Sequence, residues 1–268
     1  MKIFVVDGNW YLHRVFYTQK FESANPALSI SRRFVSLVCK DALAVKAKTV
    51  LVAFDGERVF RYQLDKQYKG NRVGKDEKGV YDHLGFLLEY LARCGLPAIQ
   101  LSKYEGDDIL CSVATQNENV VVGAGDKDGY QYLREGIVMY NSVIKPEPRL
   151  ITHKDVERIF GVPPHLCLDY QTLVGDKGDN VPSLLGPKTA QKGLVEHGSL
   201  KKWLVADKKV RAQLRPDKDR LALNRKLVRL VPDLKVPIKA IKWSSDSELP
   251  KAYFEYKQFA NAKTRSLF

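Results

Sequence analysis

The sequence predicts an α/β protein in which a mostly parallel central sheet, flanked by helices, is followed by a helical lobe. Apolar runs typical of buried strands alternate with helical patterns through the first 150 residues. Three of these runs end directly before an aspartate. From Thr152 onward the patterns are helical only. The alternation of strand-like runs and helical patterns in the first 150 residues is typical of βαβ units, which build parallel sheets.

The first half supplies the strands. The predicted strands are residues 2–6, 49–54, 119–125 and 137–143. The predicted helices cover residues 28–46 and 80–94, and another begins at Glu105. Gly95 directly follows the second helical pattern and is a typical helix-ending residue. We therefore assign residues 1–150 to the α/β core.

The second half, residues 151–268, is assigned to the helical lobe. Thr152 and Asp155 have the spacing of a capping box, and the helix that they begin ends at Gly161. Further helices follow Pro163-Pro164 and begin at Pro187, which suits the first position of a helix. The basic segments 201–214 and 217–231 have the pattern of amphipathic helices.

The composition of the chain limits the kinds of partner and location that we expect. The 268 residues include 44 Lys and Arg against 31 Asp and Glu, a formal net charge of +13, which favours a polyanionic partner such as nucleic acid. No apolar run approaches the ~20 residues of a membrane span, so no membrane is expected. The four cysteines are scattered without a C-x-x-C pair, so neither a zinc knuckle nor a disulfide framework is predicted. A reducing cytoplasm is the expected location.

Acidic residues gather at one place in this basic chain. Asp7, Asp55 and Asp126 each directly follow a predicted strand, and the carboxyl ends of parallel strands meet at one edge of a sheet. Glu105, Asp107 and Asp108 begin a helix, where acidic residues also simply complement the helix dipole. Carboxylates packed together cannot all ionise without a cation between them. An all-oxygen set favours a hard ion, Mg²⁺ or Mn²⁺.

Two features of the lobe point to phosphate chemistry. Asp176 and Asp179 are three residues apart and would share a face of a helical turn. The segment Gly186–Ala190 predicts a tight turn that enters a helix. Free backbone N–H groups at such a helix start, with Lys188 and Lys192 nearby, would form a phosphate-binding site. An ordinary helix cap is the alternative interpretation.

These residues stand in an ordered set of motifs. The motifs are VVDGN, VAFDG, YKGNR, EGDD, GDKD, GDKGDNVP and GPKTA, between about residues 2 and 200. In this order they resemble the 5′-nuclease superfamily of flap endonucleases and 5′–3′ exonucleases. The similarity extends to the standalone phage enzymes and to the N-terminal domain of bacterial DNA polymerase I.

The resemblance implies a PIN-like core and a site of nine acidic residues around two or three divalent ions. Those ligands would be Asp7, Asp55, Glu105, Asp107, Asp108, Asp126, Asp128, Asp176 and Asp179. Asp108, Asp176 and Asp179 would be outer or second-ion ligands. Asp126, Lys69 and Arg72 would be catalytic. Lys69 and Arg72 would contact the scissile phosphate and stabilise its charge. A short basic arch is expected near residues 70–82.

The resemblance also implies a helix–turn–helix clamp for duplex DNA near residues 173–198. Its DNA-binding residues would be Gly186, Lys188, Thr189 and Lys192, with a potassium ion at the element. The expected activity is metal-dependent hydrolysis of phosphodiester bonds in DNA with a 5′ flap, a 5′ overhang or a free 5′ end, during replication, repair or recombination. A monomer that meets replication proteins is expected.

Two alternatives remain open at this stage. A PIN-like endoribonuclease shares the carboxylate-lined core but would ordinarily be shorter and lack the 173–194 element. A non-catalytic DNA-binding relative would normally have several of the nine acidic residues replaced, and none is replaced here.

Overall fold

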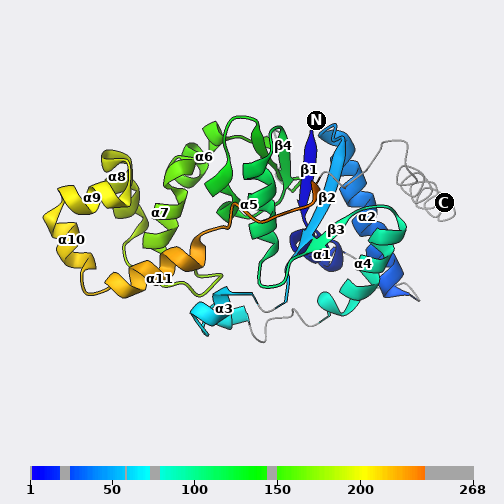
Figure 1. Cartoon of the computed structure of the whole chain (residues 1–268), viewed down its shortest axis with the longest axis horizontal. Coiled ribbons are helices and arrows are strands. Elements are labelled where there is room, and N and C mark those ends of the chain that lie inside the picture. The colour runs from blue at the N-terminus through cyan, green and yellow to red at the C-terminus, as the bar shows by residue number, and fades with distance from the viewer. Residues whose placement is uncertain (1, 19–24, 58, 73–78, 144–149, 239–268) are drawn as a thin grey trace, which may run out of the picture.

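A six-stranded sheet forms the centre of the computed structural model, which describes residues 2–18, 25–57, 59–72, 79–143 and 150–238 (Figure 1). The strands are β1 (Ile3–Asp7), β2 (Thr49–Phe54), β3 (Ala98–Gln100), β4 (Val120–Gly123), β5 (Ile137–Tyr140) and β6 (Leu150–Ile151). Their order in the sheet is β3-β2-β1-β4-β5-β6. All neighbours are parallel except β6, which pairs antiparallel with β5.

The two faces of the sheet bury two different cores. Alternate residues of a strand point to opposite faces, so Ile3 and Val5 join one apolar cluster whereas Phe4 and Val6 join the other. The Phe4 face is covered by α1 (Gly8–Tyr17), α2 (Pro26–Ala44) and α4 (Leu84–Arg93). The Ile3 face is covered by α5 (Gly106–Gln116) and continues into the lobe.

The order of the strands places a crevice beside β1. From β1 the chain moves outward to β2 and β3, then returns to β4 on the other side of β1. Such a switch point leaves an open crevice at the carboxyl ends of the strands. Asp7 ends β1 and Asp126 follows β4, so both lie at this crevice. Four short helical segments also belong to the core: α3 (Arg61–Leu64), η1 (Gly70–Arg72), η2 (Tyr81–His83) and η3 (Lys127–Tyr132).

The helical lobe lies at the opposite end of the molecule from α2 and α4 (Figure 1). Its helices are α6 (His153–Phe160), α7 (Pro164–Val174), α8 (Pro187–His197), α9 (Leu200–Ala206), α10 (Lys208–Leu214) and α11 (Lys218–Val228). The predicted capping box of Thr152 and Asp155 is present, and Gly161 ends α6 at a φ of 87°. Leu173, Leu194 and Trp203 belong to the same apolar cluster as α5, so the lobe and the sheet share one core.

The structure confirms the predicted fold class and corrects details. The sequence patterns did not predict α1, β3 or β6; the latter two are only two or three residues long. Segment 201–214 forms two helices because Asp207 ends α9 and caps α10. The assigned boundary at residue 150 falls inside β6, whose Ile151 pairs with Met139. Within the described ranges no helix has the length and apolarity to cross a bilayer.

Candidate functional site

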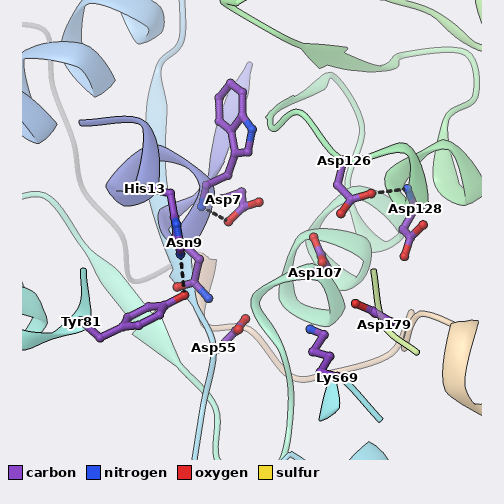
Figure 2. A pocket seen from close by; sticks show the side chains of 11 residues that line it. Asp7, Asn9, His13, Asp55, Lys69, Tyr81, Asp107, Asp126, Asp128 and Asp179 are labelled. Carbon is purple, nitrogen blue, oxygen red and sulfur yellow. Dashed lines mark hydrogen bonds between the residues drawn. The ribbon is translucent and has the colours of Figure 1, made fainter. Parts of the chain in front are cut away.

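A cavity of about 350 Å³ opens at the crevice beside β1 and collects most of the predicted acidic residues (Figure 2). It is lined by Asp7, Asn9, Trp10, His13, Asp55, Lys69, Tyr81, Asp107, Asp126, Asp128 and Asp179. Six of these are carboxylates, and they come from strand ends, from the first turn of α5, from η3 and from the lobe.

The aspartates at the strand ends are held by hydrogen bonds from backbone N–H groups, two of them local and one from a distant part of the chain. Asp7 caps α1 by accepting a hydrogen bond from Trp10 N at 2.9 Å. Asp55 accepts from Gly106 N at 2.7 Å, so it is tied to the start of α5. Asp126 accepts from Asp128 N at 3.0 Å. Each carboxylate therefore keeps one oxygen bonded to the protein and leaves acceptor capacity toward the cavity.

The carboxylates raise one another's pKa. Burial is the main cause of the raised pKa of Asp7, about 7, and the charges of Asp55 and Asp126 add to it. Burial and the surrounding aspartates, first of all Asp7, also hold the pKa of Asp107 well above its usual value. The pKa of Asp128 is raised in the same way, by burial and then by Asp126. A bound cation would relieve this repulsion, so the donor set fits a hard metal ion.

The described side chains, however, contain no group of three or more His, Cys, Asp or Glu residues arranged to hold an ion together. The carboxylates face a common space rather than a ready-made cage.

Lys69 reaches the cavity from the loop before η1. Its Nζ lies 2.6 Å from Glu105 Oε1, and its backbone has a φ of 54°, which is unusual for a non-glycine residue. Burial alone would lower the pKa of Lys69, but Glu105, Asp179 and Asp55 together raise it, so the amine stays charged. Glu105 itself lies beside the main cavity and lines a neighbouring one of about 500 Å³. The two cavities share Lys69 and Asp55.

The lobe contributes Asp179 and orients Asp128. Asp179 lines the cavity and accepts a hydrogen bond from Tyr68 Oη at 2.8 Å. The buried Gln171 of α7 donates to Asp128 Oδ1 and accepts from Gln131 Nε2 at 2.7 Å. No local pattern in the sequence marks Gln171, since a glutamine on a helix is usually exposed.

Asp176 occupies a different position from the predicted one. It does not share a helical face with Asp179, because both lie in a loop closed by the pairing of Asp176 with Val181. Its carboxylate pairs with Lys127 Nζ at 3.0 Å, outside the lining of the main cavity. Asp176 acts there by charge, as one of the groups that raise the pKa of Asp128.

Asp108 points away from the site and corrects the prediction that it is an outer ligand. It is fully buried, and both of its oxygens face the guanidinium of Arg61, at 2.6 and 2.7 Å. Asp108 also accepts from Glu105 N at 3.1 Å and from Val231 N at 3.0 Å. These bonds use its acceptor capacity within the protein. The sequence patterns did not single out Arg61, which is itself only 1% exposed.

The predicted duplex-binding residues lie together at the start of α8, which belongs to the lobe (Figure 1). Gly186 precedes the helix, and Lys188, Thr189 and Lys192 are exposed. The first hydrogen bond within α8 joins Ala190 N to Gly186 O. The backbone N–H groups of Lys188 and Thr189 come before this bond in the chain, so they have no acceptor within the helix.

Two predicted features cannot be placed. Arg72 belongs to η1, but its side chain lies outside the described part of the structure. Residues 73–78 of the predicted arch at 70–82 also lie outside the described residues. On the opposite side of the cavity, His13 Nε2 and Tyr81 Oη are 3.1 Å apart and join α1 to η2 (Figure 2).

Known proteins resemble the chain over nearly all of its length. The family model described as 5′-3′ exonuclease, N-terminal resolvase-like domain, matches residues 2–161. The model described as 5′-3′ exonuclease, C-terminal SAM fold, matches residues 162–248. Among solved structures, the bacteriophage T5 flap endonuclease in a pseudo-enzyme-product complex with DNA and metal ions has a TM-score of 0.69 and 19% identity. That match covers 97% of this chain and 100% of the phage protein.

Curated relatives give the same result. A 5′-3′ exonuclease of Aquifex aeolicus is 30% identical over 88% of this chain and 84% of the relative. The thermostable DNA polymerase I of Thermus filiformis is 29% identical over 97% of this chain and 32% of the polymerase, so the chain spans about a third of that relative's length. With family models matched from residue 2 to residue 248, the chain belongs to the 5′–3′ exonuclease family.

Proposed function

We propose that the chain is a divalent-metal-dependent 5′-nuclease that hydrolyses phosphodiester bonds of DNA at 5′ ends or 5′ flaps. The observation that carries the proposal is the convergence of six aspartates and one charged lysine on a single cavity. The family relatives named for 5′–3′ exonuclease activity, and the phage neighbour solved with DNA and metal ions, support the same substrate.

The carboxylates would hold the ions. Asp7, Asp55, Asp107, Asp126 and Asp128 face the cavity, and Asp179 completes it from the lobe. When bound, two divalent ions would supply a nucleophilic water and neutralise the phosphoryl oxygens of the bond to be cleaved. Mg²⁺ or Mn²⁺ is the proposed cofactor because every proposed ligand is a carboxylate oxygen.

Lys69 would act on the phosphate rather than on the ions. Its ammonium is held by Glu105, at the junction of the two cavities, and faces the same space as Asp55 and Asp179 (Figure 2). A positive charge fixed there stabilises the charge that develops on a phosphoryl oxygen. Arg72 is the second cation proposed for this role on the resemblance alone.

The lobe would hold the duplex next to the site. The exposed start of α8 presents two N–H groups that precede the first intrahelical bond, together with Lys188 and Lys192, which suits phosphate oxygens. A potassium ion at this element is part of the same proposal, and exchanging K⁺ for Na⁺ at constant ionic strength should then weaken duplex binding. The protein is proposed to act as a cytoplasmic monomer alongside replication proteins.

A cleavage assay tests the proposal. DNA flap, blunt duplex and single-stranded substrates carrying a 5′ label, and RNA versions of each, are incubated with Mg²⁺, Mn²⁺ or Ca²⁺. We expect cleavage of 5′-ended DNA with Mg²⁺ or Mn²⁺ and binding without turnover in Ca²⁺. Asp126→Ala should remove cleavage, whereas Asp219→Ala, an exposed aspartate of α11, should not. Undiminished cleavage in excess EDTA, or cleavage of RNA alone, would overturn the proposal.

A further inference from the structure

A third, smaller cavity of about 250 Å³ lies between α1 and α2, and its lining has the opposite charge to that of the carboxylate cavity. Its lining residues are Arg14, Val15, Thr18, Arg33, Ser36, Leu37 and Lys40. It therefore offers three cations and two hydroxyl groups and no carboxylate. The Thr18 hydroxyl already donates to Arg14 O at 2.7 Å, so the donors that face the cavity are mainly guanidinium and ammonium groups. Such donors around a small cavity suit a tetrahedral oxyanion such as a phosphate group.

The positive charge of this cationic cavity is not neutralised by the part of the protein that is described. Arg14, Arg33 and Lys40 form no ion pair with an acidic residue in those ranges. Asp41, the one acidic residue of α2, is buried and accepts instead from Tyr11 Oη at 2.8 Å. Arg14 is fixed in place by donating to Ser142 Oγ and by lying 5.7 Å from the Trp10 ring.

Helix α1 separates the cationic cavity from the carboxylate cavity. Asn9, Trp10 and His13 line the carboxylate cavity, whereas Arg14 and Thr18 line the cationic one. The path from Asp7 to Thr18 along α1 is roughly 16 Å at the rise of an α-helix. Phosphates of one DNA strand advance about 3.4 Å along the helix axis per nucleotide. A strand held at the carboxylates would therefore have a phosphate near the cationic cavity about five nucleotides away.

We propose that this cationic cavity binds a backbone phosphate of the DNA substrate, a few nucleotides from the bond that is cleaved. The proposal rests on the function proposed above and adds a contact to it that is separate from the carboxylates and from α8. Its expected role is to fix the path of the substrate, not to take part in hydrolysis.

Paired alanine variants test the site. Arg33→Ala with Lys40→Ala removes two lining cations, and Arg32→Ala with Lys48→Ala removes two exposed cations that do not line the cavity. Both changes remove the same net charge, so long-range electrostatic effects cancel in the comparison. Binding isotherms are measured in Ca²⁺ at several salt concentrations, on flap substrates whose strands are shortened stepwise from each end.

The lining variant should lower the salt slope of log K by about 1, because the one phosphate contact made in the cavity is lost. Its loss of affinity relative to the control should then shrink about three- to fourfold between about 50 and 200 mM salt. The difference should disappear once the strand becomes too short to reach the cavity. Cleavage at saturating substrate should stay near wild type. Equal affinity and slope for both variants at every length would overturn the proposal.

Two further measurements distinguish a free-phosphate site from a failure of the proposed function. If inorganic phosphate raises the Tm of the wild-type protein but not of the lining variant, while DNA affinity is equal, the cavity is a free-phosphate site and the DNA assignment is wrong. If the wild-type protein binds no DNA and cleaves none, the proposed function has failed. If the wild-type protein binds and cleaves DNA but the lining and control variants have the same affinity and salt slope, only this inference is refuted and the proposed function stands.

Discussion

Asp107 and Asp108 are adjacent in the sequence and have opposite surroundings in the structure. Asp107 lines the carboxylate cavity, where neighbouring aspartates raise its pKa. Asp108 is buried against Arg61, which also lies 3.0 Å from Glu105. One side chain is therefore costly to ionise and available to a cation, and the other is satisfied inside the protein.

This contrast predicts opposite effects of the same substitution. Asp107→Asn should abolish cleavage and leave the free energy of unfolding equal or higher. Asp108→Asn should lower the free energy of unfolding by about 3–5 kcal/mol, because it breaks the buried bidentate ion pair with Arg61 and leaves that guanidinium with Glu105 alone. Urea unfolding of the metal-free proteins, with a single-turnover cleavage assay, measures both. Equal stability of the two variants would show that Asp108 is not the structural residue.

Asp7 gives a prediction about pH. Its pKa is about 7 in the folded protein, raised by burial and by Asp55 and Asp126. A raised folded pKa stabilises the protein below the unfolded value near 4, and this contribution is lost as the pH rises toward 7. The metal-free protein should therefore lose stability between about pH 4 and 7 from this group.

The substitution Asp7→Asn should remove the loss of stability that Asp7 causes as the pH rises. Asparagine can still cap α1 by accepting from Trp10 N, so the variant should melt higher than wild type at pH 8, by roughly 2–4 °C for each kcal/mol of repulsion removed. The difference should be small at pH 4. Adding Ca²⁺ at pH 8 should make the wild type melt higher than the variant, because the wild type has one more carboxylate charge to bind the ion. A variant that melts lower at pH 8 without metal would contradict the raised pKa.

At the scale of elements, the ends of strands and helices carry the chemistry. Asp7 and Asp126 end or follow neighbouring strands and cap the helical turns that come next. The N-terminus of α5 supplies the N–H that binds Asp55. A side chain at Gly106 would lie 3.3 Å from Asp55 Oδ1, so glycine there keeps this approach open. Helix α8 presents its N-terminus to solvent.

The start of α8 predicts a measurable ionic contact. Lys188→Ala should lower the salt slope of log K for flap and duplex DNA by about 1, because one phosphate contact fewer is made. The effect should be independent of sequence, since phosphates carry no base information. Lys201→Ala, which removes an exposed cation of α9, serves as the control. A slope equal to wild type would leave the start of α8 as an ordinary helix terminus.

At the scale of the molecule, the lobe and the sheet form the site together. Arg61 donates to Leu227 O and Arg229 O at the end of α11, at 2.8 and 2.7 Å, while it holds Asp108 of α5. Tyr68 joins Asp179 of the lobe to Glu105 of the core. Lys127 of the core pairs with Asp176 of the lobe. The position of the lobe therefore sets the geometry of the carboxylates.

Substitution of Gln171 tests whether the carboxylates depend on contacts from the lobe. Gln171→Leu has a similar volume but cannot donate to Asp128, so it should weaken Mn²⁺ binding by about 10–100-fold, the usual cost of losing an outer partner of a ligand. Calorimetric titration of Mn²⁺ measures this without relying on activity. Gln131→Leu should have a smaller effect, because Gln131 acts on Asp128 only through Gln171, while it also donates to Val228 O at 2.8 Å. Gln116→Leu, on the far end of α5, should bind Mn²⁺ as wild type does.

The sequence by itself determined the parallel sheet and the acidic edge. Buried strands read as apolar runs, and an aspartate directly after such a run must lie at the carboxyl end of its strand. Asp7, Asp55 and Asp126 were therefore predicted together, and they line one cavity. The start of α8 was predictable because Gly186 and Pro187 act within one turn.

The tertiary structure alone decided which acidic residues face the cavity. Asp107 and Asp108 have the same local pattern, and their difference depends on Arg61, 47 residues away from Asp108 in the chain. Gln171 meets Asp128 across 43 residues, and the cationic cavity joins residues of two helices. Local patterns report only neighbours in sequence, whereas burial and partner charge depend on contacts that folding brings together.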